Sequence, residues 1–113
     1  MINQKITSEE LNWIGIDFDN CLCENSGLPD FIPTLPIKGS HLGIARIVAM
    51  GYKPIIFTAR PWSEFNIVKN WLKDNNFTDI KTIICGKPLM RTMIDDRAIG
   101  FRGDWDDAVD QII

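Results

Sequence analysis

Residues 12–25 read NWIGIDFDNCLCEN, a short apolar run that ends in two carboxylates one residue apart. The apolar run predicts a buried strand, which we place at residues 11–18. Asp17 and Asp19 at its end repel each other, and like charges are costly to bury unless something cationic shares the site. A metal ion or a lysine would meet that need, and the rest of the chain decides whether either is present.

Length and composition predict one domain, residues 1–113, with an ordinary 45% of hydrophobic residues. A net charge of -3 gives no support for a nucleic-acid binder that works through bulk charge. The first ten residues are polar and no long apolar stretch follows, which predicts neither secretion nor a membrane span. Three cysteines, with Cys21 and Cys23 spaced unlike a zinc pair, fit a reducing compartment. We therefore expect a cytoplasmic protein.

Strand-like and helix-like segments alternate along the chain, which predicts an α/β domain with a parallel sheet covered on both faces. Residues 20–39 contain Asn, Gly and Pro without a sustained period and predict a long loop. Ser40 and Ser63 are the expected N-caps of two helices, and Gly51 is the expected stop of the first. Further strands are expected at 53–60, 80–86 and, as a fourth short strand followed by a fifth, 91–101; helices are expected at 40–51, 63–77 and 104–113.

Polar residues follow each of the expected strands. Ligands of open parallel sheets collect at the carboxyl ends of the strands, so these side chains are expected to meet at one edge. In chain order they are Asp17 and Asp19, Thr58 and Arg60, Lys87, then Asp95 and Asp96. Each short motif alone is weak, and the order of the set carries the hypothesis.

This ordered set resembles the haloacid dehalogenase superfamily of phosphatases and phosphotransferases. The matching stretches are DFDN at 17–20, IIFTAR at 55–60, GKP at 86–88 and IDDR at 94–97, and the resemblance covers about residues 12–100. It implies a three-layer sandwich around a roughly five-stranded parallel, Rossmann-like sheet. It also implies a capless member, because neither usual insertion point holds enough residues for a cap domain.

The resemblance implies a Mg²⁺-dependent phosphatase that acts on phosphate monoesters through an aspartyl phosphate. Asp17 would be the nucleophile and Asp19 the general acid and base. Around the phosphate the resemblance places Thr58, Ala59, Arg60 and Lys87, of which Thr58 donates a hydrogen bond and Lys87 neutralises charge. As metal ligands it implies Asp17, Asp19 (through its backbone carbonyl), Asp95 and Asp96.

The sequence departs from the family pattern after the second aspartate, where Gly followed by Thr or Val is usual and Asn20 and Cys21 stand instead. Asn tolerates the left-handed backbone of a turn, and Cys packs as a small apolar side chain. Arg60 and Arg97 are candidates either for anion contact or for structural pairs with the acidic residues.

An open site suits a phosphorylated small molecule or a macromolecular phosphate end, so nucleotides, nucleic-acid ends and sugar phosphates all stay open as substrates. Nucleic acid enters only as a substrate, no membrane partner is expected, and self-association stays open. Two other classes also stay open: a receiver-like switch that accepts a phosphoryl group, and a non-catalytic binding module on the same fold. A receiver places its phospho-accepting Asp after the third strand, where this chain has Cys85 and Gly86.

Overall fold

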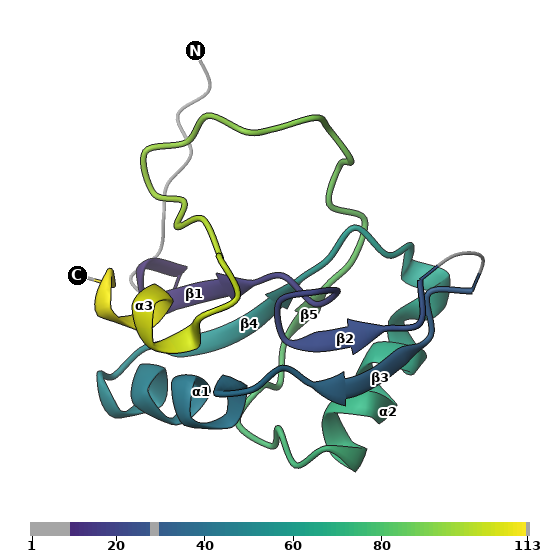
Figure 1. Ribbon diagram of the computed structural model, residues 1–113, viewed down its shortest axis with the longest axis horizontal. Coiled ribbons are helices and arrows are strands. Elements are labelled where there is room, and N and C mark those ends of the chain that lie inside the picture. The colour runs from purple at the N-terminus through teal and green to yellow at the C-terminus, as the bar shows by residue number, and fades with distance from the viewer. Residues whose placement is uncertain (1–9, 28–29, 113) are drawn as a thin grey trace.

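A computed structural model describes residues 10–27 and 30–112 of this chain. Three parallel strands, β1 (Trp13–Ile16), β4 (Lys53–Phe57) and β5 (Ile83–Ile84), form a sheet in the order β1-β4-β5. The register pairs Ile16 with Ile56, and Phe57 with Ile84. Figure 1 shows these strands side by side, with their carboxyl ends at one edge. The chain is thus a small α/β domain with a parallel sheet, as predicted.

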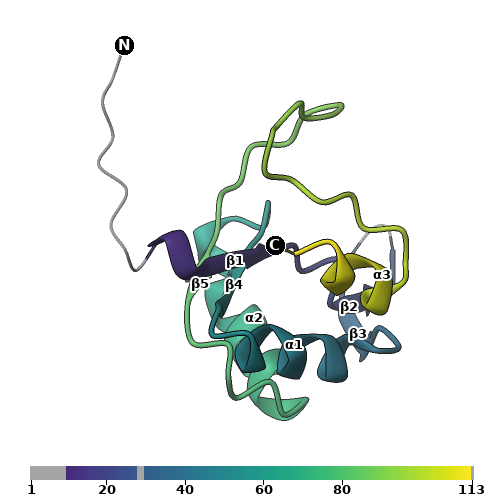
Figure 2. The ribbon, with the colours of Figure 1, turned by 90° about the vertical axis from the view of Figure 1, so that its left-hand side faces the viewer.

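Three helices accompany the sheet. They are α1 (Ser40–Ala49), α2 (Phe65–Asp74) and α3 (Trp105–Asp110), with short 3-10 turns η1 (Glu10–Asn12) and η2 (Trp62–Glu64). Figure 2 shows α1 and α2 on the same side of the sheet, whereas residues 87–103 arch out on the other side. No helix of the described residues is long and apolar enough to span a membrane.

The predicted five-stranded sheet is wrong, because the described residues supply only three strands to it. Residues 91–101 were expected to add the fourth and fifth strands, yet they form no regular structure. A strand needs a neighbour for its backbone groups, and no strand of the described residues pairs with this segment. The Asp95 carboxylate instead accepts a hydrogen bond from the Arg97 backbone N–H at 2.7 Å, which turns the chain locally.

The predicted long loop at 20–39 is also wrong in part, since it contains an antiparallel pair, β2 (Cys23–Asn25) and β3 (Pro33–Pro36). The prolines occupy the ends of β3, where a missing N–H is tolerated. The Thr34 hydroxyl donates to the Glu24 carbonyl, and the Ile37 backbone N–H donates to the Leu22 carbonyl. These bonds turn a segment without periodicity into a hairpin in front of the sheet edge (Figure 1).

The predicted stop of the first helix at Gly51 is confirmed, whereas the two predicted serine caps are wrong. Gly51, at φ 89°, ends α1, and the Tyr52 N–H donates to the Ile47 carbonyl in a Schellman arrangement. Ser40 is the first residue of α1, not its N-cap, which is Gly39. Ser63 lies inside η2 and does not cap α2.

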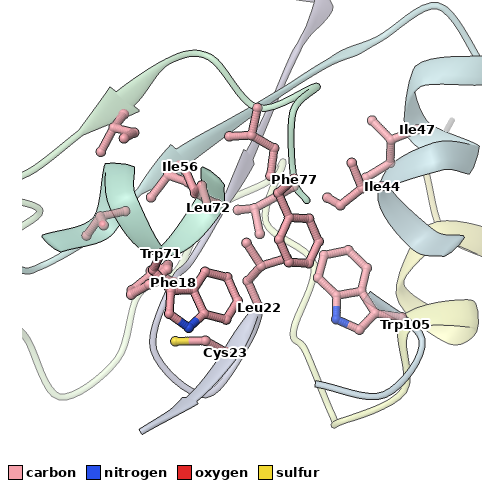
Figure 3. Packing of buried hydrophobic residues seen from close by; sticks show 14 of the residues in the cluster. Phe18, Leu22, Cys23, Ile44, Ile47, Ile56, Trp71, Leu72, Phe77 and Trp105 are labelled. Carbon is pink, nitrogen blue, oxygen red and sulfur yellow. The ribbon is translucent and has the colours of Figure 1, made fainter. Parts of the chain in front are cut away.

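A single hydrophobic core joins the sheet, the helices and the turn after β1 (Figure 3). Phe18 and Leu22, on either side of the Asp19 turn, are fully buried in it. Phe18 meets Trp71 of α2 edge to face at 5.2 Å between ring centroids. Trp105 of α3 packs against the core and donates its indole N–H to the Cys21 carbonyl. The backbone that presents Asp17 and Asp19 is therefore held by buried neighbours on both sides.

Candidate functional site at the carboxyl edge of the sheet

Asp17 is the first residue after β1, and its carboxylate is half exposed at the sheet edge. Its Oδ1 accepts a hydrogen bond from the Phe18 N–H at 2.9 Å and lies 3.3 Å from Nζ of Lys87. Because the Asp17 side chain is 47% exposed, a ligand that approaches from solvent can reach this carboxylate. The predicted meeting of Asp17 with Lys87 is therefore present, although 70 residues separate them in the sequence.

Thr58 and Lys87 are brought together through the backbone. The Thr58 N–H donates to the Ile84 carbonyl, and the Lys87 N–H donates to the Thr58 carbonyl, both at 2.9 Å. These bonds continue the β4–β5 pairing beyond the strands. They place Lys87 at the sheet edge, where its side chain reaches Asp17. The Thr58 side chain is buried and its hydroxyl accepts from the Arg60 N–H at 3.2 Å. This hydroxyl therefore stabilises the turn after β4 and does not line the open cavity.

Arg60 grips Asp19. Its Nε and Nη2 donate to the two carboxylate oxygens of Asp19 at 2.9 and 2.7 Å, which is a bidentate pair. Nη1 donates to Glu64, one helical turn further on, at 2.8 Å, and Nη2 also donates to the Phe31 carbonyl. Burial lowers the pKa of Arg60, but the hydrogen bonds and charges of Asp19 and Glu64 outweigh it and leave the pKa above its ordinary value. Arg60 is thus a structural partner of the acidic residues and is permanently charged.

Hydrogen bonds hold the turn between Asp19 and β2, which contains the two departures from the family pattern. Asn20 adopts φ 58°, the left-handed conformation that a turn with Asn was expected to allow. Its N–H donates to the Cys23 carbonyl at 2.8 Å, and Asn25 donates its side-chain amide to Asp19. Cys21 packs partly buried against the core, as predicted for a small apolar side chain. Asn20 and Cys21 are therefore both compatible with an ordered turn next to Asp19.

The thiols beside the site are held neutral. Burial, with a further contribution from Asp17, raises the pKa of Cys21 from 9.0 to about 12. Burial, with a further contribution from Asp19, raises the pKa of Cys23 to about 12 as well. A thiolate is the reactive form of cysteine, so neither side chain is a nucleophile near neutral pH.

Asp95 and Asp96 lie away from the other predicted site residues. Both are exposed on the arching segment, where Asp95 accepts a hydrogen bond from the Arg97 backbone N–H and Asp96 lies 3.9 Å from the Arg97 side chain. Across residues 10–27 and 30–112, no three His, Cys, Asp or Glu side chains gather closely enough to hold a metal ion. The structure therefore does not assemble the four-aspartate ligand set that the resemblance implied.

A cavity of about 780 Å³ opens beside Asp17 and Lys87. Its lining brings together the sheet edge, the hairpin loop, the turn after β4 and the arching segment, and includes Asp17, Asp19, Asn20, Ala59, Arg60 and Lys87. Sequence reasoning missed five further polar or aromatic lining residues: Asn25, Asp30, Phe57, Glu64 and Thr92. Only Glu64 left a usable signal, because it stands four residues after Arg60 on an expected helix start.

Comparison of the chain with protein-family models, with curated proteins and with solved structures gives no match.

Proposed function

We propose that this chain is a Mg²⁺-dependent phosphatase that transfers the phosphoryl group of a monoester to Asp17 and then to water, on a capless, Rossmann-like domain of the haloacid dehalogenase type. The observation that carries the proposal is the Asp17–Lys87 pair at the carboxyl edge of the parallel sheet, at the mouth of the cavity. An exposed carboxylate oxygen beside an ammonium group is what an anionic phosphoryl group requires in order to approach a carboxylate.

The chemistry follows from the two aspartates. An oxygen of Asp17 forms a bond to phosphorus while the bond to the leaving oxygen breaks, and Asp19 gives that oxygen a proton. Asp19 then takes a proton from water, whose oxygen attacks phosphorus, releases inorganic phosphate and restores the Asp17 carboxylate. Lys87 stabilises the negative charge on the phosphoryl oxygens in both steps. Because Arg60 donates two hydrogen bonds to Asp19, Asp19 has to release Arg60 before it can carry a proton.

We propose a sparse magnesium site with few protein ligands. Magnesium keeps several waters and uses one or two protein carboxylates together with substrate phosphate oxygens. Asp17, whose side chain is half exposed, and the backbone carbonyl of Asp19 would hold the ion next to the phosphate. When bound, Mg²⁺ would supply positive charge that lowers the repulsion between Asp17 and the phosphoryl group.

Asp95 and Asp96 lie on the arching segment, residues 87–103, and could reach the metal only if this segment moves. This segment exposes several large apolar side chains, so an arrangement that covers them is favourable. The exposed ones are Leu89, Met90, Met93, Ile94 and Ile99. We propose that the segment closes toward the cavity when Mg²⁺ and phosphate are bound, and that Asp95 and Asp96 then contact the ion or its waters.

The test measures phosphate release from a generic aryl phosphate, with and without Mg²⁺. The native chain is expected to turn over only with Mg²⁺, and Asp17→Asn is expected to lose about 10³-fold or more of kcat. Asp79→Asn is the matched control, because Asp79 is exposed and does not line the cavity. Unchanged turnover in Asp17→Asn would exclude Asp17 as the nucleophile. Stable phosphorylation of the native chain by a small phosphodonor, without turnover, would support a receiver-like switch in place of the phosphatase.

A further inference from the structure

The proposed phosphatase site fixes where a phosphoryl group would lie, and the surface next to that position is aromatic. Phe57, the last residue of β4, is 39% exposed and lines the cavity. Nζ of Lys87 lies 5.4 Å from the centre of the Phe57 ring and 3.3 Å from Asp17. The leaving group of a monoester bound at Asp17 and Lys87 therefore lies within reach of the Phe57 ring.

The remainder of the cavity extends this apolar surface. Phe31 of the hairpin loop is 45% exposed, and Met90 and Met93 of the arching segment are 56% and 55% exposed. Exposed aromatic and thioether side chains bind flat rings well, since ring faces and polarisable sulfur make favourable contacts. A leaving group without an aromatic ring, such as a bare sugar, would leave this surface in water.

The charges of the cavity limit the substrate to a single phosphoryl group. Its lining holds four carboxylates, from Asp17, Asp19, Asp30 and Glu64, against two cations, Arg60 and Lys87. Arg60 is already bound to Asp19, Glu64 and the Phe31 carbonyl, so Lys87 is the cation that faces a ligand. Additional phosphates in a polyphosphate or a nucleic-acid strand would meet net negative charge.

We infer that the cavity takes a phosphate monoester with one phosphoryl group and a flat aromatic ring in its leaving group, as in a nucleoside monophosphate. The ring lies against Phe57 and Phe31, and the phosphoryl group lies at Asp17 and Lys87. This inference rests on the proposed phosphatase function and narrows the three substrate classes that the sequence left open.

The experiment compares adenosine 5′-monophosphate with ribose 5-phosphate, which share the same leaving hydroxyl and differ in the base. With Mg²⁺ present, kcat/KM for the nucleotide is expected to be about tenfold higher or more, the effect of one stacked base. Phe57→Leu keeps an apolar side chain without the ring and is expected to bring this ratio towards one. Trp62→Leu is the matched control, because Trp62 is an exposed aromatic residue outside the cavity lining, and it is expected to keep the ratio.

A second comparison uses a 5′-phosphorylated oligonucleotide. Its kcat/KM is expected to lie below that of the mononucleotide at low salt, and the gap is expected to narrow as salt screens the carboxylates. Preference for the oligonucleotide would overturn the single-phosphate part of the inference. Equal kcat/KM for the nucleotide and ribose 5-phosphate would overturn the aromatic part and leave the phosphatase function standing.

Failure of the phosphatase function itself has a different signature, the absence of phosphate release from every substrate. Titration calorimetry of the native chain with the same two ligands then decides the inference. Tighter binding of the nucleotide, lost in Phe57→Leu and kept in Trp62→Leu, would support this ligand class in a binding module. Equal binding, or none, would overturn the inference together with the proposed function.

Discussion

Arg60 places one guanidinium group among three acceptors: the carboxylates of Asp19 and Glu64 and the carbonyl of Phe31. Its side chain is only 8% exposed, and its charged end lies over the Phe18 ring. Buried ion pairs contribute little when complete, but removing one partner leaves the other without compensation. Loss of Arg60 is therefore expected to destabilise the fold, because the carboxylates of Asp19 and Glu64 would remain without a cation.

Arg60→Met keeps the apolar stem and removes the charge. We expect this change to lower the free energy of unfolding by about 2 kcal/mol or more, because Asp19 and Glu64 lose their cation. Arg46→Met is the matched control, since Arg46 pairs with Asp106 and Asp110 on the exposed surface and is expected to change stability little. Urea denaturation at pH 7 measures both. Equal losses would show that the Arg60 network is no stronger than a surface pair.

The raised pKa values of Cys21 and Cys23 predict how the stability of the fold depends on pH. The pKa of Cys21 and Cys23 rises from 9.0 to about 12 on folding, so the folded chain retains protons that the unfolded chain releases above pH 9. This contribution to stability is complete below about pH 9 and is lost as pH rises towards 12. At pH 8 we expect a thiol reagent to react far more slowly with the native chain than with the chain in urea. Rapid reaction of the native thiols would contradict the burial of both side chains.

At the scale of elements, α1 and α3 meet at a glycine. A Cβ on Gly43 would lie 2.5 Å from an atom of the Trp105 ring, too close for an ordinary contact. Alanine favours a helix interior over glycine by up to about 1 kcal/mol, but the clash opposes that gain. Gly43→Ala is therefore expected to cost about 1–3 kcal/mol as the two helices separate.

Gly51→Ala is the comparison for this prediction. A Cβ there meets nothing within 4 Å, but φ is 89°, so only backbone strain opposes the substitution. Urea denaturation is expected to show losses in both variants. Near-ultraviolet circular dichroism is expected to change in Gly43→Ala alone, because only that variant displaces Trp105. An unchanged spectrum and full stability in Gly43→Ala would contradict the close packing of α1 on α3.

The sequence predicted those elements whose signals are local. The apolar run before Asp17, the amphipathic stretch at 63–77 and the acidic start of the last helix each produced the expected type of element. Asp104 caps that last helix by accepting from the Asp107 N–H. The β2–β3 hairpin was missed because its pairing depends on contacts between residues such as Leu22 and Ile37, which no local period reveals.

The site likewise contains some contacts that the sequence predicts and others that it does not. The pairing of Asp17 with Lys87 was predictable, since parallel strands deliver their carboxyl ends to one edge. The bidentate pair of Arg60 with Asp19 was one of two alternatives, the other being contact with a bound anion. The sequence does not reveal which acceptor a guanidinium reaches. The positions of Asp95 and Asp96 were not predictable from their motif, because the expected strand that would have carried them to the edge has no partner in the described sheet.

At the scale of the whole molecule, residues 88–100 are exposed throughout and have no regular structure. Exposed segments of this kind are preferred sites of proteolysis. We expect trypsin to cleave first at Arg91 and Arg97, before the basic residues of α2 are reached. Mass spectrometry of early fragments identifies the sites. First cleavage within α2 would contradict the described exposure of this segment.

The closure proposed for this segment adds a second expectation. Mg²⁺ together with inorganic phosphate is expected to slow cleavage at Arg91 and Arg97, and Asp95→Asn is expected to reduce that protection. Each ligand alone is expected to protect less, because neither completes the charge balance around Asp17. Identical cleavage rates under all conditions would show that Asp95 stays outside the metal site.

The shared guanidinium of Arg60 makes the hairpin loop and the candidate general acid parts of one linked equilibrium. Asp19 and the Phe31 carbonyl accept from the same Nη2 atom, so a displacement of either acceptor alters how firmly the other is held. Thermodynamic reciprocity then requires that a ligand which draws Asp19 away from Arg60 also changes how firmly the loop is held at Phe31. Amide exchange at Ile32, whose N–H is bonded to the Ser26 hydroxyl, would report the chemical state of Asp19 from outside the site.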